Sequence, residues 1–214
     1  HSIGGRPLAP RFIPHGVLAL CRDSSDATWL VDGLGRVHRL VGEVLEAIEA
    51  PIEVRHVACG APDDVWFASA GSLAHWDGAA ITWVAAFTWA PIEALWSTGP
   101  DDLWVVADSM LVHWDGSTWT EMVVPGVDVS AVHASSPSDV WAVGADGRAA
   151  HWDGTTWTVT QAPTENDLMR VWSSGPDRAW AIGGGRLFTW DGSAWASDFN
   201  EGFGVWRLAG YGGK

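Results

Sequence analysis

Short apolar runs separated by turn residues recur along the whole chain. One unit reads "LMRVWSS", "GPDR", "AWAIG", a glycine turn, "RLFTW", "DGS" and "AWASDF" over residues 168–199. Apolar runs of about four to eight residues bounded by Gly, Pro and Asp are typical of β-strands. No segment sustains the apolar period of a capped helix. The pattern therefore predicts an all-β protein with four short strands in each unit.

The tryptophans fall into columns when the sequence is shifted against itself by 37 to 39 residues. The first column is Trp29, Trp66, Trp104, Trp141 and Trp180, the second is Leu40, Trp76, Trp114, Trp152 and Trp190, and the third is Leu45, Trp83, Trp119, Trp157 and Trp195. Thirteen of the seventeen Trp lie in these columns, so the chain is a repeat protein. The five units span about residues 15–52, 53–90, 91–128, 129–166 and 167–202.

Turn residues recur at fixed places in the unit. Pro-Asp pairs at 62–63, 100–101 and 176–177 suit a β-turn between the first and second strands. Asp-Gly pairs at 77–78, 115–116, 153–154 and 191–192 suit a hairpin turn that requires positive φ. Both pairs predict antiparallel neighbours within each unit.

Four antiparallel strands in each repeat of this length predict the blade of a β-propeller. The column tryptophans would fill the space between blades. The ends of the chain, residues 1–14 and 203–214, resemble pieces of the same unit, and together they would form a composite blade that closes the ring. We expect a single propeller domain over residues 1–214 with six blades; five blades is the alternative.

Composition narrows the classes of partner. The formal charge of −14, from 12 Lys and Arg against 26 Asp and Glu, disfavours nucleic acid. The apolar runs are too short for membrane insertion, and the N-terminal residues lack the order of a signal peptide. Cys21 and Cys59 fall on the innermost strands of adjacent blades but one position apart. Because they would then point to opposite faces, we expect two buried free thiols rather than a disulfide.

The repeat also carries a resemblance. The segments "VWSSGPDRAW" and "VWAVGADGRAAHWDGTTWT" are similar to the Trp-rich propeller repeats of secreted and lipid-anchored proteins of myxobacteria, and more distantly to kelch and Asp-box propellers. The resemblance covers residues 15–200 and implies a propeller fold and a secreted or cell-surface location for a processed chain. It implies no particular activity, because most members of that group have no assigned function. The Asp-box form is only approximated, since Asp and Gly are adjacent here, which weakens a sialidase-like inference.

The repeated polar residues are expected to have structural roles. His75, His113 and His151 occupy one column, but equivalent positions on different blades lie too far apart to share a metal. The aspartates of the Asp-Gly pairs are expected to cap turns. We expect a solvated acidic rim at Asp63, Asp64, Asp101, Asp102, Asp139 and Asp177. The dense acidic spacing of calcium loops is missing, so no cofactor or metal is predicted.

The residues that differ between repeats are the candidates for function. The variable column on the innermost strand is Cys21, Ala58, Trp96, His133 and Trp172, and Trp206 continues it. The neighbouring column of Leu20, Val57, Leu95, Val132 and Val171 is uniformly apolar and should pack between blades. We predict a ligand-binding patch near one channel mouth, made of Trp96, His133, Trp172, Arg170, His56 and Trp206. Filling of a narrow channel is the alternative role for these side chains.

No catalytic residues are predicted, because the chain has no Gly-x-Ser-x-Gly motif and only one Tyr, Tyr211. The favoured function is a non-catalytic, extracellular binding module that recognises a carbohydrate or a protein partner. The alternatives are a glycan hydrolase or lyase, and a structural subunit of a larger secreted assembly.

Overall fold

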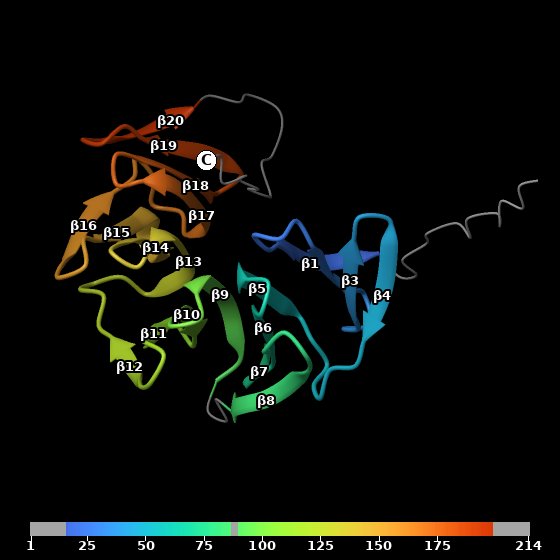
Figure 1. Ribbon diagram of the computed structural model, residues 1–214. Helices are drawn as coiled ribbons and strands as arrows, with labels where there is room; N and C mark the ends of the chain where they lie inside the picture. The colour runs from blue at the N-terminus through green and yellow to red at the C-terminus, as the bar shows by residue number, and fades with distance from the viewer. Residues whose placement is uncertain (1–15, 87–89, 199–214) are drawn as a thin grey trace, which may run out of the picture.

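The computed structural model describes residues 16–86 and 90–198. These residues form five four-stranded antiparallel sheets, each in the strand order of the sequence. The sheets surround a central axis, with the first strand of each innermost and the fourth outermost (Figure 1). The protein is therefore a β-propeller, as the repeat predicts, and each sheet is one blade.

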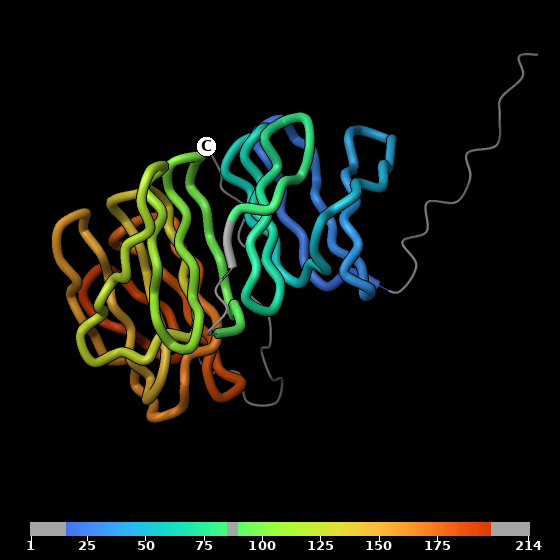
Figure 2. The backbone as a smooth tube through the Cα atoms, turned by 90° about the horizontal axis from the view of Figure 1, so that it is seen from below, coloured from blue at the N-terminus to red at the C-terminus, as the bar shows by residue number. Residues whose placement is uncertain are grey.

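The blade boundaries follow the predicted units. The first blade comprises β1 (Val17–Arg22), β2 (Thr28–Asp32), β3 (Val37–Val41) and β4 (Val44–Ile48), and the second β5 (His56–Ala61), β6 (Asp64–Ser69), β7 (Ser72–Trp76) and β8 (Ile81–Ala86). The third comprises β9 (Ile92–Gly99), β10 (Asp102–Ala107), β11 (Met110–Trp114) and β12 (Trp119–Met122). The fourth comprises β13 (Val129–Ser136), β14 (Asp139–Gly144), β15 (Arg148–Trp152) and β16 (Trp157–Gln161), and the fifth β17 (Leu168–Gly175), β18 (Arg178–Gly183), β19 (Arg186–Trp190) and β20 (Trp195–Asp198). Seen from below, the strands of each blade run between the two faces of the ring (Figure 2).

The hairpin turns form as the Asp-Gly pairs predict. Gly78, Gly116, Gly154 and Gly192 have φ between 88° and 96°, where only glycine is unstrained. The Asp115 carboxylate accepts hydrogen bonds from the backbone amides of Ser117 and Thr118, and the other three aspartates repeat this arrangement. Local sequence alone thus determines the connection between the third and fourth strands.

The first-column tryptophans form the core between blades. Trp29, Trp104 and Trp141 are fully buried, and Trp141 packs against Trp190 and Trp195 of the next blade with ring centroids 5.5 Å apart in both pairs. Burial of such large rings removes much apolar area from water, so these contacts hold neighbouring blades together.

One residue of the predicted third column is in the wrong position. Ile81, not Trp83, lies opposite Trp76, in the place that Trp119, Trp157 and Trp195 take in later blades. Trp83 follows two residues later on the same strand, and 56% of its surface is exposed. The turn after Asp77 has the same length as its counterparts, so the residue that follows the turn, rather than the nearest Trp, takes the core position.

The five described blades form an arc that is open between the first and the fifth (Figure 1). Leu95, Val132 and Val171 pack between blades as predicted, but Leu20 on the open side of the first blade is 63% exposed. On the fifth blade Trp180 is only half-buried, whereas its counterparts are buried. The composite blade expected from residues 1–14 and 203–214 lies outside the described residues.

Cys21 and Cys59 form a disulfide with their Cα atoms 5.8 Å apart, so the prediction of free thiols is wrong. The one-position offset is real, because Cys21 pairs with Trp29 and Cys59 with Val65, one place from the equivalent Trp66. However, adjacent blades pack face to face, so side chains that point to opposite faces of neighbouring sheets meet in the space between them. The disulfide therefore joins the innermost strands of the first two blades.

Candidate functional site

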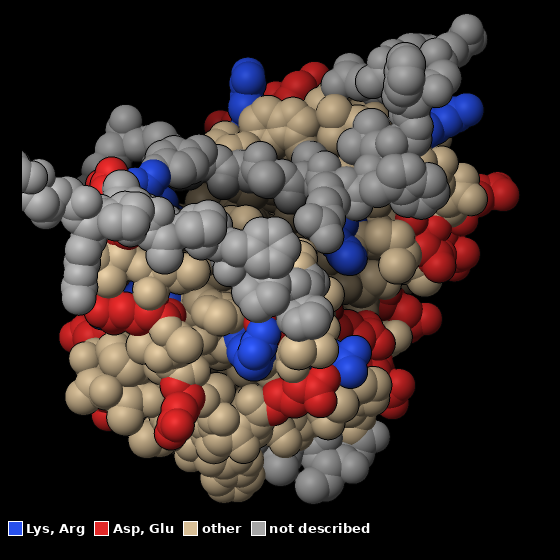
Figure 3. Space-filling model, turned by 90° about the vertical axis from the view of Figure 1, so that its right-hand side faces the viewer, with Lys and Arg blue, Asp and Glu red and all other residues tan. Residues whose placement is uncertain are grey.

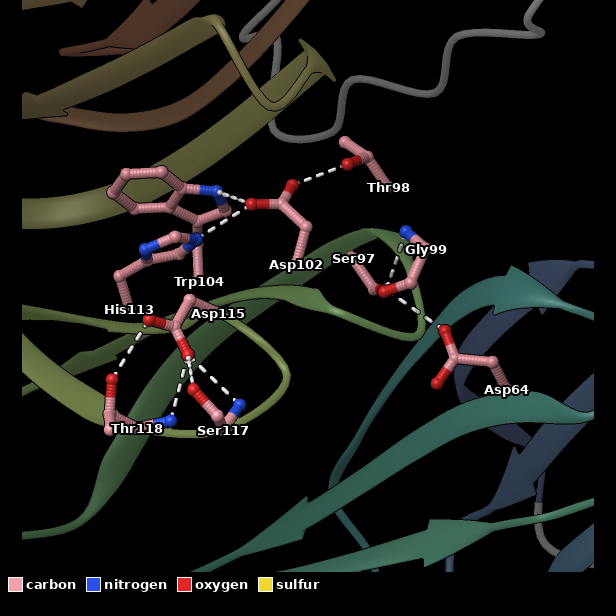
Figure 4. Close-up of polar contacts among 10 residues, drawn as sticks. All are labelled: Asp64, Ser97, Thr98, Gly99, Asp102, Trp104, His113, Asp115, Ser117 and Thr118. Atoms are coloured by element: carbon pink, nitrogen blue, oxygen red, sulfur yellow. Dashed lines mark hydrogen bonds and ion pairs between the residues drawn. The ribbon is translucent and has the colours of Figure 1, made fainter. Parts of the chain in front are cut away.

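The repeated histidines are bound within their own blades. Nε2 of His113 lies 2.7 Å from Asp102 Oδ1, and the same oxygen accepts a hydrogen bond from Trp104 Nε1 at 3.1 Å (Figure 4). The imidazole also stacks on the indole of Trp104, with ring centroids 4.1 Å apart. The second and fourth blades repeat the imidazole–carboxylate contact with His75–Asp64 and His151–Asp139. These histidines link the second and third strands of a blade.

We call each such set of Asp, His and adjoining Trp a trio. The aspartates of these trios do not form a solvated acidic rim. Asp64, Asp102 and Asp139 are at most 5% exposed, which corrects the prediction for these three positions. Asp63, Asp101 and Asp177 are exposed as expected. The two sets alternate because the turn between the first and second strands directs one carboxylate outward and the next inward, where the indole and imidazole donors offset its loss of hydration.

The trios also have the wrong connectivity for nucleophilic catalysis. The Thr98 hydroxyl donates to Asp102 Oδ2, and the Ser135 hydroxyl donates in the same way to Asp139. In a catalytic triad the hydroxyl must reach the imidazole, which then removes its proton. Here hydroxyl and imidazole bind the same carboxylate, so the geometry supports a structural role.

The turn aspartates are equally committed to structure. Hydrogen bonds from the backbone and side chain of Thr118 and Ser117 hold the pKa of Asp115 well below its usual range. The corresponding bonds from Ala194 and Ser193 lower the pKa of Asp191 to about 2. A carboxylate stabilised in this way is a poor general acid near neutral pH.

The non-repeating residues on the innermost strands meet between blades. The rings of Trp96 on β9 and His133 on β13 pack in a tilted arrangement with centroids 4.0 Å apart, and the His133 ring lies 5.7 Å from that of Trp172 on β17. Trp96 Nε1 donates to the carbonyl of Ala134 at 2.7 Å. Three of the predicted site residues therefore form one aromatic ladder across three blades. Trp96 and His133 fill the space between blades, while Trp172 stays half-buried on the open face of the fifth blade.

His133 is held as a neutral imidazole. Its Nδ1 accepts a hydrogen bond from the Ser173 backbone amide at 3.1 Å, so Nε2 carries the proton. Burial lowers the pKa of His133 to about 4, against a smaller opposing effect of the Asp139 charge. Its Nε2 is buried and makes no hydrogen bond to the described residues.

His56 and Arg170 belong to another column of the innermost strands, one that lies two residues before the variable column. Each is two residues before the position that pairs with the first-column Trp, where the other three blades carry Ala19, Ala94 and Ala131. Arg170 is exposed, and its guanidinium donates to the carbonyl of Met169 at 2.6 Å. Burial, then the positive charges of Arg170 and Arg55, lowers the pKa of His56. Arg170 belongs to the fifth blade and His56 to the second, so this interaction crosses the centre of the ring.

Sequence comparison between repeats missed Arg55 and Ser173. Arg55 precedes the first residue of β5 and was not in the variable column, although its repeat counterparts Leu18, Glu93, Ser130 and Met169 all differ from one another. That variability was the available signal. Ser173 orients His133 by a contact that only the packing of two blades creates. Trp206, the sixth predicted site residue, lies outside the described residues.

A hollow in the surface of the described residues lies away from these central residues. It has a volume of about 790 Å³ and lies beside the fourth blade, lined by Asp146, Arg148 and Gln161 among others. The Gln161 side-chain amide donates to the carbonyls of Asp146 at 2.7 Å and Thr164 at 3.0 Å. These bonds tie two loops together, so the polar groups of the hollow maintain its shape.

In the described part of the chain, no group of three or more His, Cys, Asp or Glu side chains could hold a metal ion. Over residues 16–86 and 90–198, no helix is both long and apolar enough to cross a membrane.

Comparison with known proteins identifies the fold but assigns no family. No known protein family matches the sequence, and no curated protein matches it. Among solved structures, the chain is similar to "YCF48 bound to D1 peptide", with a TM-score of 0.67 and 14% identity over 90% of this chain and 70% of that one. It is also similar to "Structure of U3-55K", with a TM-score of 0.73 and 12% identity over 92% of this chain and 71% of that one. At these identities the likeness establishes the β-propeller fold alone.

Proposed function

We propose that the protein is a non-catalytic interaction module that binds a protein partner at the centre of the ring. One observation carries this proposal. The ionisable side chains that recur in the repeat are bound within their blades. By contrast, Arg170, His56 and Trp172 occupy positions of the innermost strands that vary between blades, and none of the three is fully buried; Trp172 lies on the open face of the fifth blade. Binding residues are expected where a repeat departs from its own pattern, because packing does not require those side chains.

The half-buried Trp172 supplies the apolar part of such a surface. Its ring packs against Trp180 with centroids 5.0 Å apart and against His133, so its position is already restrained. A partner that covers a restrained indole loses little side-chain entropy, which is why Trp is frequent at the energetic centre of protein interfaces.

Two further observations support the proposal. A solved structure with the same fold, YCF48, is bound to the D1 peptide, which favours a polypeptide ligand over a carbohydrate here. The Cys21–Cys59 disulfide is consistent with a secreted or cell-surface location, because disulfides persist in oxidising compartments. A module of this kind would also suit a larger extracellular assembly.

The test uses the full chain with two probes, a phage-displayed random peptide library and a glycan array. Peptides recovered from the library are synthesised and their affinities measured by calorimetry for the wild type, Trp172→Ala and Trp83→Ala. Trp83 is the matched control, because it is an exposed Trp on the outer strand β8. We expect Trp172→Ala to weaken binding by about tenfold or more and Trp83→Ala to leave it unchanged.

Circular dichroism and thermal melting establish that both variants fold. Recovery of glycans but no peptides would overturn the proposed protein partner, as would equal losses of affinity in the two variants. Turnover of a glycan, shown by chromatography of the products, would overturn the non-catalytic role.

A further inference from the structure

The innermost strands differ in charge from the rest of the molecule. The chain has 26 Asp and Glu, yet only Glu93 lies on β1, β5, β9, β13 or β17. The same strands carry Arg22, Arg170, His56 and His133. On the face drawn in Figure 3, acidic side chains are spread over the surface with basic ones between them, and the chain as a whole has 26 acidic residues against 12 Lys and Arg. The innermost strands are therefore poor in carboxylates within a strongly acidic protein.

Arg55, His56 and Arg170 lie at one mouth of the ring. The innermost strands occupy equivalent places in their blades and run in the same direction, so their first residues lie at the same end of the axis. His56 and Arg170 belong to this end, and Arg55 directly precedes β5. The charges of Arg170 on the fifth blade and of Arg55 beside β5 both lower the pKa of His56, in line with their position at the same end of the axis.

The surroundings leave these charges available. Arg170 is exposed and has no carboxylate partner among the described residues, since its guanidinium bonds the carbonyl of Met169. Arg55 lies 3.5 Å from Glu53 in an ion pair whose side chains are both more than half exposed, and such a pair contributes little and exchanges readily. At the level of Arg170 the other three blades supply Ala19, Ala94 and Ala131, so these blades place no carboxylate at this level.

We propose that this mouth binds a carboxylate-rich segment of the protein partner, with Arg170 and Arg55 as the anchoring residues. The inference rests on the proposed function and names its ligand. An arginine can hold a carboxylate by two parallel hydrogen bonds, a geometry that selects this group. The acidic exterior repels extended polyanions, whereas the two arginines supply local positive charge for a short acidic segment.

The experiment measures fluorescence anisotropy of a labelled peptide of alternating Glu and Gly against the full chain. Matched peptides replace Glu with Gln or with Lys, and titrations are run at about 20 mM and about 500 mM NaCl, where screening differs strongly. We expect the Glu peptide to bind more tightly than the Gln peptide at low salt, and the Lys peptide to bind least. High salt should remove most of the preference.

The variants compare arginines on the same blade. Arg170→Gln should weaken binding of the Glu peptide by about five- to tenfold, and Arg178→Gln by less than about twofold. Arg178 is a matched control, because it is exposed and begins β18 near the opposite end of the blade. Arg55→Gln should resemble Arg170→Gln.

Equal affinity for the Glu and Gln peptides would overturn the inference, as would equal effects of Arg170→Gln and Arg178→Gln. Preferential binding of a sulfated polysaccharide such as heparin, displacing the peptide, would also overturn it. Library peptides that bind through Trp172 but are not acidic would overturn only the carboxylate inference and leave the interaction module standing. Absence of binding by every peptide would overturn both.

Discussion

Reduction of the Cys21–Cys59 disulfide is expected to destabilise the ring from the first blade. The bond joins two innermost strands that are 38 residues apart in sequence. In the chain-entropy description, closing a loop of this length lowers the entropy of the unfolded chain by about 13 cal/mol/K, which corresponds to about 4 kcal/mol at 25 °C. Both cysteines are only half-buried, so little packing is lost in addition.

Urea unfolding of the oxidised and reduced protein measures this effect. With a slope near the upper part of the usual range of about 1–3 kcal/mol/M, reduction should lower the midpoint by about 1–2 M. The Cys21→Ala/Cys59→Ala double variant should unfold near the midpoint of the reduced protein and should not respond to the reductant. This control separates loss of the bond from other effects of the reducing agent.

Limited proteolysis locates the loss of structure. The first blade has one described neighbouring blade, so the disulfide supplements a single interface there. Trypsin should therefore cut the reduced protein first at Arg36 or Arg39, within the first blade. A change of less than about 1 kcal/mol on reduction, or first cleavage in the third or fourth blade, would refute this reasoning.

Three further predictions concern buried and turn residues. Asp102→Ala leaves the His113 imidazole and a buried indole without their acceptor. The substitution should therefore lower the free energy of unfolding by about 2–4 kcal/mol in urea titrations. An unchanged midpoint would contradict the trio's structural role. Gly116→Ala should lower the free energy of unfolding more than Gly42→Ala in the same assay. Both glycines have positive φ, but only at Gly116 would a Cβ lie 2.3 Å from a neighbouring carboxylate oxygen. The pKa of His133 is about 4 when folded, below its unfolded value, so its contribution is complete above about pH 6.5 and is lost as the pH falls toward 4. His133→Gln should reduce the loss of unfolding free energy between about pH 6.5 and pH 4 by up to about 3 kcal/mol. An unaltered pH profile of stability would exclude His133 as the source of this loss.

The elements that could be predicted from sequence are those determined by nearby residues. Asp115 and Gly116 define their hairpin because one supplies the acceptor and the other the positive φ, both within the turn itself. The first-column tryptophans could be assigned to the core because they recur at the same place in every blade. Fold class and strand order followed from these two features.

The candidate site was predicted only in part. Trp96, His133 and Trp172 do lie together, because equivalent positions on successive innermost strands are neighbours in a ring. Their exposure depends on whether the face of the blade has a neighbouring blade. Trp96 and His133 are packed between blades, whereas Trp172 and Arg170 are accessible. A column alignment treats all blades alike, so it could not separate them.

By itself, the sequence of this protein determined the β-propeller, its five described blades, the turns and the positions at which the repeat varies. Only the tertiary structure decided that Cys21 and Cys59 are bonded, that Asp64, Asp102 and Asp139 are buried, and that Arg170 acts across the ring on His56. The first set depends on contacts a few residues apart or repeated along the chain. The second depends on how the face of one blade meets the next, and the identity of the residues in one repeat does not specify that contact.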